Sequence, residues 1–172
     1  NIKILSESRS QFDYITNILE QEDRGKARAF AEHAFAVLIF ILAVFVVIIE
    51  LLMPWAMLVL APGFNLIPNK MELATELSRI AFPYLIFISL VSLQSGVLNA
   101  LGRFAAAAAT PILFNLILIA AMMGFRDWLE TPGHVLSWAV SAAGFIQVLW
   151  LAWYCKHIGF PIRLRRPRLT EK

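Results

Sequence analysis

The sequence predicts an all-α polytopic membrane protein with four membrane-spanning helices. Of its 172 residues, 59% are hydrophobic and only 16% are charged, and its mean hydropathy of +0.70 lies outside the usual range of water-soluble domains. Two apolar blocks of 22 residues, 80–101 and 104–125, contain no Asp, Glu, Lys or Arg. Because a helix rises about 1.5 Å per residue, roughly 20 such residues cross the hydrocarbon core of a bilayer.

The N-terminal segment, residues 1–29, is polar and mixed in charge. Acidic residues gather at positions 20–23, and basic residues follow at positions 24–28. Apolar side chains at positions 12–19 have some amphipathic spacing, which is compatible with a surface helix or with a solvated loop. We expect a polar, partly helical lead-in.

The first span is expected at residues 30–53, because positions 34–49 carry no charge. Pro54 would kink the helix or start a second, interfacial piece. Glu50 is the acid inside this apolar block, and a carboxylate in a span is a functional candidate because its burial in lipid is costly. Its place near the expected helix end offers the alternative that it reaches head groups or water.

The second and third spans, residues 80–101 and 104–125, form a hairpin. A loop rich in turn-forming Pro, Gly and Asn precedes it at residues 61–69. Gly102 can adopt the backbone angles of the tight turn, and Arg103 is disfavoured in lipid. The fourth span is expected at residues 135–155, with aromatic rings near its end that suit a membrane interface. A basic tail, residues 156–172, follows and would lie against an anionic leaflet.

Four amide side chains lie inside the expected spans and are expected to be buried. They are Gln94, Asn99, Asn115 and Gln147. Such side chains either line a polar path or hold helices together through hydrogen bonds. Together with Glu50 they are the candidates for a substrate path or for helix packing.

Basic residues predict the orientation. Twelve of the fifteen Lys and Arg residues lie in the N-terminal segment, the hairpin turn and the tail, which share one side of a four-span topology. Lys70, Arg79 and Arg126 lie on the other side. By the positive-inside rule, both ends of the chain are expected in the cytoplasm.

Several classes of function are disfavoured. The basic residues sit between spans, so they indicate topology and lipid head groups rather than nucleic acid. His33, His134 and His157 lie at or beyond span ends without ligand spacing, so we expect no metal and no cofactor. The single Cys155 cannot form an internal disulfide. No pair of carboxylates and no serine with an adjacent base suggests an enzyme.

The hairpin and its flanks resemble the lipid II flippase family called MurJ or MviN. The resemblance is carried by FPYLIFISL at 82–90, SGVLNALGRFAA at 95–106 and TPILFN at 110–115. It continues in LAPGF at 60–64 and in WAV at 138–140 with Gly144 and Gln147 after it. The match covers about residues 27–166.

This resemblance implies a fragment of a two-lobed transporter of the MOP exporter superfamily, with this chain holding the third to sixth spans of one lobe. The family moves the undecaprenyl-diphosphate-linked peptidoglycan precursor across the inner membrane by alternating access. The implied partners are that lipid-linked precursor, membrane lipids and the missing transmembrane helices of the same transporter. The substrate-contacting residues of the family lie mainly on spans outside this chain. Another MOP-superfamily exporter of lipid-linked polysaccharide or drugs, or a non-transporting membrane scaffold subunit, are the alternatives.

Overall fold

The computed structural model describes residues 2–161, with side chains from residue 23 onward. Its elements are helix α1 (Ile2–Leu60), the 3-10 helix η1 (Pro62–Leu66), and helices α2 (Lys70–Ala81), α3 (Tyr84–Ala100), α4 (Phe104–Ala108), α5 (Thr110–Phe125) and α6 (Pro132–His157). Residues 2–161 contain no β-strand, and the predicted all-α fold is confirmed. Residues 162–172 of the predicted basic tail lie outside the described residues.

Four stretches of the described chain are long and apolar enough to cross a membrane. They are Asp23–Leu60, Lys70–Ala100, Phe104–Phe125 and Pro132–His157. These stretches overlap the four expected spans in order. The second is made of α2 and α3, and the third of α4 and α5, so two of the four spans are broken helices.

Helix α1 is longer than the first expected span. It is helical from Ile2, through the polar lead-in, and it continues past Pro54 to Leu60. A proline is tolerated inside a membrane helix when neighbouring groups or local adjustment satisfy the freed backbone groups. The helix ends where Ala61 and Pro62 lead into η1.

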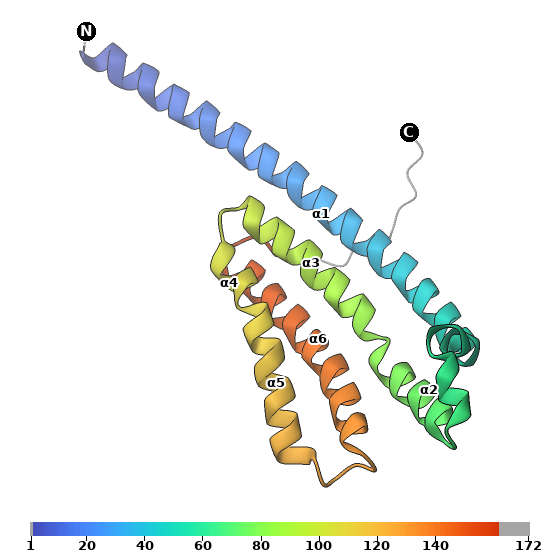
Figure 1. Ribbon diagram of the computed structural model, residues 1–172. Helices are drawn as coiled ribbons and strands as arrows, with labels where there is room; N and C mark the ends of the chain where they lie inside the picture. Colours follow the sequence, from blue (N-terminus) through green and yellow to red (C-terminus); the bar gives the residue numbers. More distant parts are fainter. Residues whose placement is uncertain (1, 162–172) are drawn as a thin grey trace.

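The helices stand side by side in the order α1, α3, α6 and α5 (Figure 1). Helix α6 packs against both α3 and α5, while α1 packs against α2 and α3. A buried apolar cluster of Val91, Leu98, Ala106, Leu151 and Cys155 joins α3, α4 and α6. Helix α6 is therefore the central element that connects the two arms of the hairpin.

The break between α2 and α3 lies at Pro83. A proline has no N–H to donate and its ring disrupts the preceding turn, so carbonyls near residue 79 lose their helical partners. The carbonyl of Ile80 accepts a hydrogen bond of 2.7 Å from the hydroxyl of Ser141 on α6. On either side of the break, Phe82 N–H donates to Ser78 O and Leu85 N–H donates to Phe82 O. Helix α6 thus supplies this carbonyl with a hydrogen bond that lipid cannot provide.

The break between α4 and α5 lies at Ala109, just before Pro111. The missing N–H of Pro111 leaves Ala107 O without its helical donor, and the Thr110 hydroxyl donates to that oxygen at 2.8 Å. Gln147 of α6 donates its Nε2–H to the carbonyl of Thr110 at 2.7 Å. A longer contact of 3.4 Å joins Trp150 Nε1 to Ala106 O. Helix α6 therefore bonds the backbone at both breaks.

A glycine lets α6 approach α3 closely. A Cβ atom added at Gly144 would lie 2.6 Å from Cδ2 of Tyr84 and 2.8 Å from Cβ of Phe87. Neither distance is compatible with normal van der Waals contact, and Cβ of Phe87 cannot move without its backbone. Small residues at such positions allow close packing of membrane helices.

We predict that Gly144→Ala lowers the free energy of unfolding by about 1–3 kcal/mol, the usual range for overpacking. The measurement is unfolding of the complete protein in mixed detergent micelles. Gly124→Ala is the matched control, because an added Cβ there meets nothing within 4 Å. Equal stabilities of the two variants would contradict this description of the α3–α6 contact.

Candidate functional site

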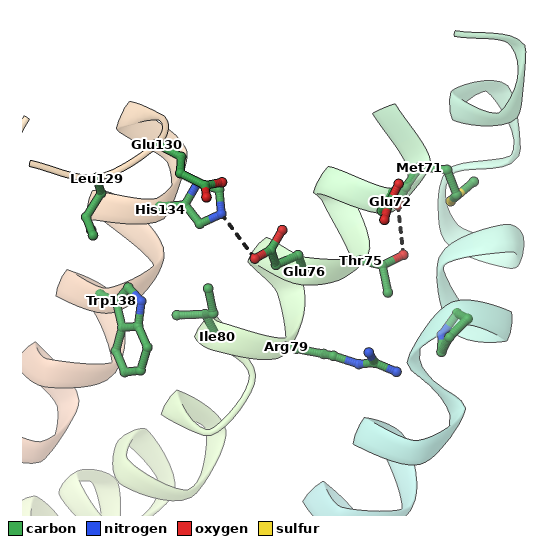
Figure 2. A pocket seen from close by; sticks show the side chains of 11 residues that line it. Met71, Glu72, Thr75, Glu76, Arg79, Ile80, Leu129, Glu130, His134 and Trp138 are labelled. Carbon is green, nitrogen blue, oxygen red and sulfur yellow. Dashed lines mark hydrogen bonds and ion pairs between the residues drawn. The ribbon is translucent and has the colours of Figure 1, made fainter. Parts of the chain in front are cut away.

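A cleft of about 1050 Å³ lies where the ends of α1 and α2 meet the start of α6 (Figure 2). Its walls combine apolar side chains with four formally charged ones. The lining residues are Pro54, Met71, Glu72, Thr75, Glu76, Arg79, Ile80, Leu129, Glu130, His134 and Trp138. With three carboxylates and one guanidinium, the cleft has an excess of negative charge when His134 is neutral.

His134 bridges two elements across this cleft. It begins α6, it is buried, and its Nε2 lies 3.5 Å from Oε1 of Glu76 on α2. Figure 2 shows this pair facing each other, with Glu130 beside the histidine ring. Gly133 brings the two helices together, because an added Cβ would lie 2.9 Å from Leu77 Cδ1. The pair is an ionic contact when the imidazole is protonated.

The other ring nitrogen of His134 belongs to the helix cap. Thr131 is the N-cap of α6, where its hydroxyl oxygen accepts the backbone N–H of His134 and lies 2.9 Å from Nδ1. That hydroxyl therefore stabilises the helix end, and the arrangement indicates a structural role rather than nucleophilic catalysis. Among residues 23–161, whose side chains the structure describes, no three His, Cys, Asp or Glu side chains are grouped closely enough to hold a metal ion.

Glu50 lies on α1 and Arg79 on α2. Glu50 lies one helical turn before Pro54, which lines the cleft together with Arg79. Figure 2 shows the Arg79 side chain extending from α2 toward α1. Oxygen Oε1 of Glu50 is buried, and the described part of the chain provides no hydrogen bond to it. Opposite charges on neighbouring helices thus stand at the same end of the molecule as the cleft.

The four predicted amides divide into buried and exposed pairs. Gln94 and Gln147 are each only 2% exposed, and Gln147 donates a hydrogen bond to Thr110 O at the α4–α5 break. Asn99 on α3 and Asn115 on α5 are exposed. No hydrogen bond or ion pair of the described part joins any two of Gln94, Asn99, Asn115, Gln147 and Glu50. The structure therefore shows no direct polar contact among these five candidates.

Sequence reasoning did not identify the bridge between His134 and Glu76, or the role of Ser141. His134 was placed at a span end and given no function. The two residues of the bridge are 58 positions apart, and only the packing of α2 on α6 makes them neighbours. The dipeptide Thr131-Pro132 could have indicated that a helix begins just before His134, since threonine followed by proline is typical of a helix start.

Comparison with known proteins identifies one family. The family model described as "Lipid II flippase MurJ" matches residues 12–172. A protein of Rhizobium tropici named "Probable lipid II flippase MurJ" is 38% identical over 84% of this chain, and one of the same name from Rhizobium meliloti strain 1021 is 38% identical over 88%. "Lipid II flippase MurJ" of Burkholderia cenocepacia is 35% identical over 75% of the chain. The chain spans 28%, 29% and 25% of the length of these three relatives.

The charged lining predicts that the cleft contains water. We expect Thr75→Cys, in a Cys155→Ala background, to react with a membrane-impermeant maleimide in the purified complete protein. Ala143→Cys is the matched control and should stay unreactive, because position 143 is fully buried. Protection of both cysteines from the reagent would mean that the cleft is dry. Mass spectrometry of the intact protein measures the extent of labelling.

Proposed function

We propose, from the premise that this chain belongs to the lipid II flippase MurJ family, that it is part of a transporter of the lipid-linked peptidoglycan precursor. The transporter would move undecaprenyl-diphosphate-linked precursor across the bacterial inner membrane without converting it chemically. The observation that carries the proposal is the match to the family over residues 12–172. The four long apolar helices support it, because such a transporter must be a multi-pass membrane protein.

Within that transporter, α3, α5 and α6 would act as one rigid unit. Alternating access in repeat-built transporters is largely the rocking of one bundle against another around a central site. A bundle can transmit such motion only if its own helices do not slide. The contacts of Ser141, Gly144 and Gln147 favour this role, since they join α6 to the end of α2, to α3 and to the α4–α5 break.

The exposed amides are the better candidates for contacts outside this bundle. Asn99 and Asn115 lie within apolar spans, yet both are exposed on the surface of the described part of the chain. A polar side chain at membrane depth needs either another helix or a wet cavity. We propose that these two face the substrate path or the transmembrane helices beyond this chain, whereas Gln94 and Gln147 serve packing.

The proposed orientation has both ends of this chain in the cytoplasm. The support is the distribution of basic residues, twelve on one side and three on the other. The cleft at His134 would then open toward the periplasm, and in intact cells the Thr75→Cys variant should label without permeabilisation. Labelling that requires permeabilisation would reverse the orientation.

Transport is tested by complementation. The complete gene that encodes this chain should restore growth and precursor export in cells depleted of their own lipid II flippase. Failure to restore export, with the protein present in the membrane at normal amounts, would contradict the proposed activity.

Two variants in the same assay distinguish a role in the substrate path from a role in helix packing. Asn99→Leu should lower export per molecule while the amount of protein stays normal. Gln147→Leu should instead lower the amount of folded protein, because a hydrogen bond worth about 1 kcal/mol is lost at the α4–α5 break. The proposed division of the amides would be contradicted if Asn99→Leu lowered the amount of folded protein and Gln147→Leu lowered export per molecule.

A further inference from the structure

A second, smaller pocket lies at the other end of the bundle from the His134 cleft. It has a volume of about 220 Å³ and is formed by three separate parts of the chain. Helix α1 contributes Arg24 and Arg28, the α3–α4 turn contributes Arg103, and the segment after α6 contributes residues 158–160. We call it the arginine pocket.

The arginine pocket has more positive than negative charge. Arg24 and Arg28 are one helical turn apart on α1, so their side chains share a face. Arg28 Nε is paired with Glu32 Oε1 at 3.0 Å, which neutralises part of its charge. Glu20, Glu22 and Asp23 precede Arg24 in the sequence. None of the described residues that line the pocket is acidic. Among the described residues, no ion pair is formed by Arg24 or Arg103, and both are exposed.

Two rigid turns hold the walls of the pocket in place. At the end of α3, Gly102 has φ +70°, and Arg103 N–H donates to Leu98 O at 2.8 Å. At the end of α6, Gly159 has φ +77°, and Phe160 N–H donates to Cys155 O at 2.9 Å. Both are Schellman motifs, in which a left-handed glycine closes the helix end. Leu98 and Cys155, whose carbonyls accept these two bonds, belong to the same buried cluster, which places the two turns beside each other.

The pocket also lies at the depth of a lipid head group. Arg103 separates two membrane-spanning stretches, Lys70–Ala100 and Phe104–Phe125, so it stands where the hydrocarbon region ends. Phe104, next to it, is 63% exposed and offers apolar surface on the membrane side. An amphipathic ligand could thus place a charged group among the arginines and its acyl chains beside the helices.

We propose that the arginine pocket binds a phosphate group, supplied by an anionic phospholipid of the adjacent leaflet. Guanidinium groups recognise phosphate oxygens through paired, charge-assisted hydrogen bonds, which makes arginine the preferred residue for this chemistry. Basic pockets between membrane helices on the cytoplasmic side recognise lipid head groups in the same way. The bound lipid would connect α1 to the α3–α4 turn and to the end of α6. This inference does not depend on transport activity.

The test uses the complete protein, extracted from nanodiscs that contain phosphatidylglycerol and phosphatidylcholine, with retained lipid counted by native mass spectrometry. Wild-type protein should retain phosphatidylglycerol selectively. Arg24→Gln and Arg103→Gln should each weaken retention about 10-fold, the effect of losing one charge-assisted hydrogen bond. Arg126→Gln is the matched control, an exposed arginine at the opposite end, and should retain lipid as wild type does. Thermal unfolding in detergent checks that each variant is folded.

A second arm distinguishes the source of the phosphate. Millimolar inorganic phosphate should not displace phosphatidylglycerol if a membrane lipid is the ligand. Phosphate that displaces it, and that binds only when Arg24 and Arg103 are present, would assign the pocket to a soluble phosphate compound instead. Equal retention of phosphatidylglycerol by wild type, Arg24→Gln and Arg103→Gln would overturn the proposal.

Discussion

Every backbone carbonyl at membrane depth must find a hydrogen-bond donor inside the protein, because lipid provides none. This constraint is severe here, since two of the four apolar stretches are interrupted at prolines. The structure meets it with a side chain beside the second break, where the Thr110 hydroxyl donates to Ala107 O, and with side chains of α6. Ser141 of α6 reaches Ile80 O at the first break, and Gln147 reaches Thr110 O at the second. Helices α2, α3 and α5 pack directly on α6, and α1 packs on the outer side of α2 and α3 (Figure 1).

The same arrangement explains why the two polar pockets lie at opposite ends of the bundle. The middle of α6 packs closely on its neighbours, because Gly144 has no side chain and lets Tyr84 and Phe87 approach the helix. At one end, residues of α1, α2 and the start of α6 line the cleft, where His134 contacts Glu76. At the other end α1 stands apart from α6, and the arginine pocket lies between them. A rigid centre with polar ends is a suitable component for a lobe that rocks as one body.

Much of this fold is readable from the sequence. Apolar length alone predicted four spans in the right order, because the requirement to fill a bilayer acts on each span separately. The hairpin turn at Gly102 was also predicted, since a tight turn needs positive φ, and Gly102 has φ +70°. The family was indicated by the residues around that hairpin, and the match over residues 12–172 confirms it.

Pairings between helices were not predictable in the same way. Ser141 meets Ile80 across 61 positions, and Gln147 meets Thr110 across 37, through packing that no local pattern encodes. The sequence predicted unbroken spans at 80–101 and 104–125, and the breaks at Pro83 and Pro111 are known only from the structure. The same limit applies to the arginine pocket, whose three walls come from distant parts of the chain.

The central claim is that the Ser141 hydroxyl is needed because Pro83 interrupts the α2–α3 helix. A double-mutant cycle between Ser141→Ala and Pro83→Ala, measured as free energies of unfolding of the complete protein in mixed micelles, tests it most directly. Alanine at position 83 can restore the helical donors, so Ser141→Ala should then destabilise the protein by much less than the roughly 1 kcal/mol expected in the wild-type background. Strictly additive effects of the two substitutions would contradict the claim.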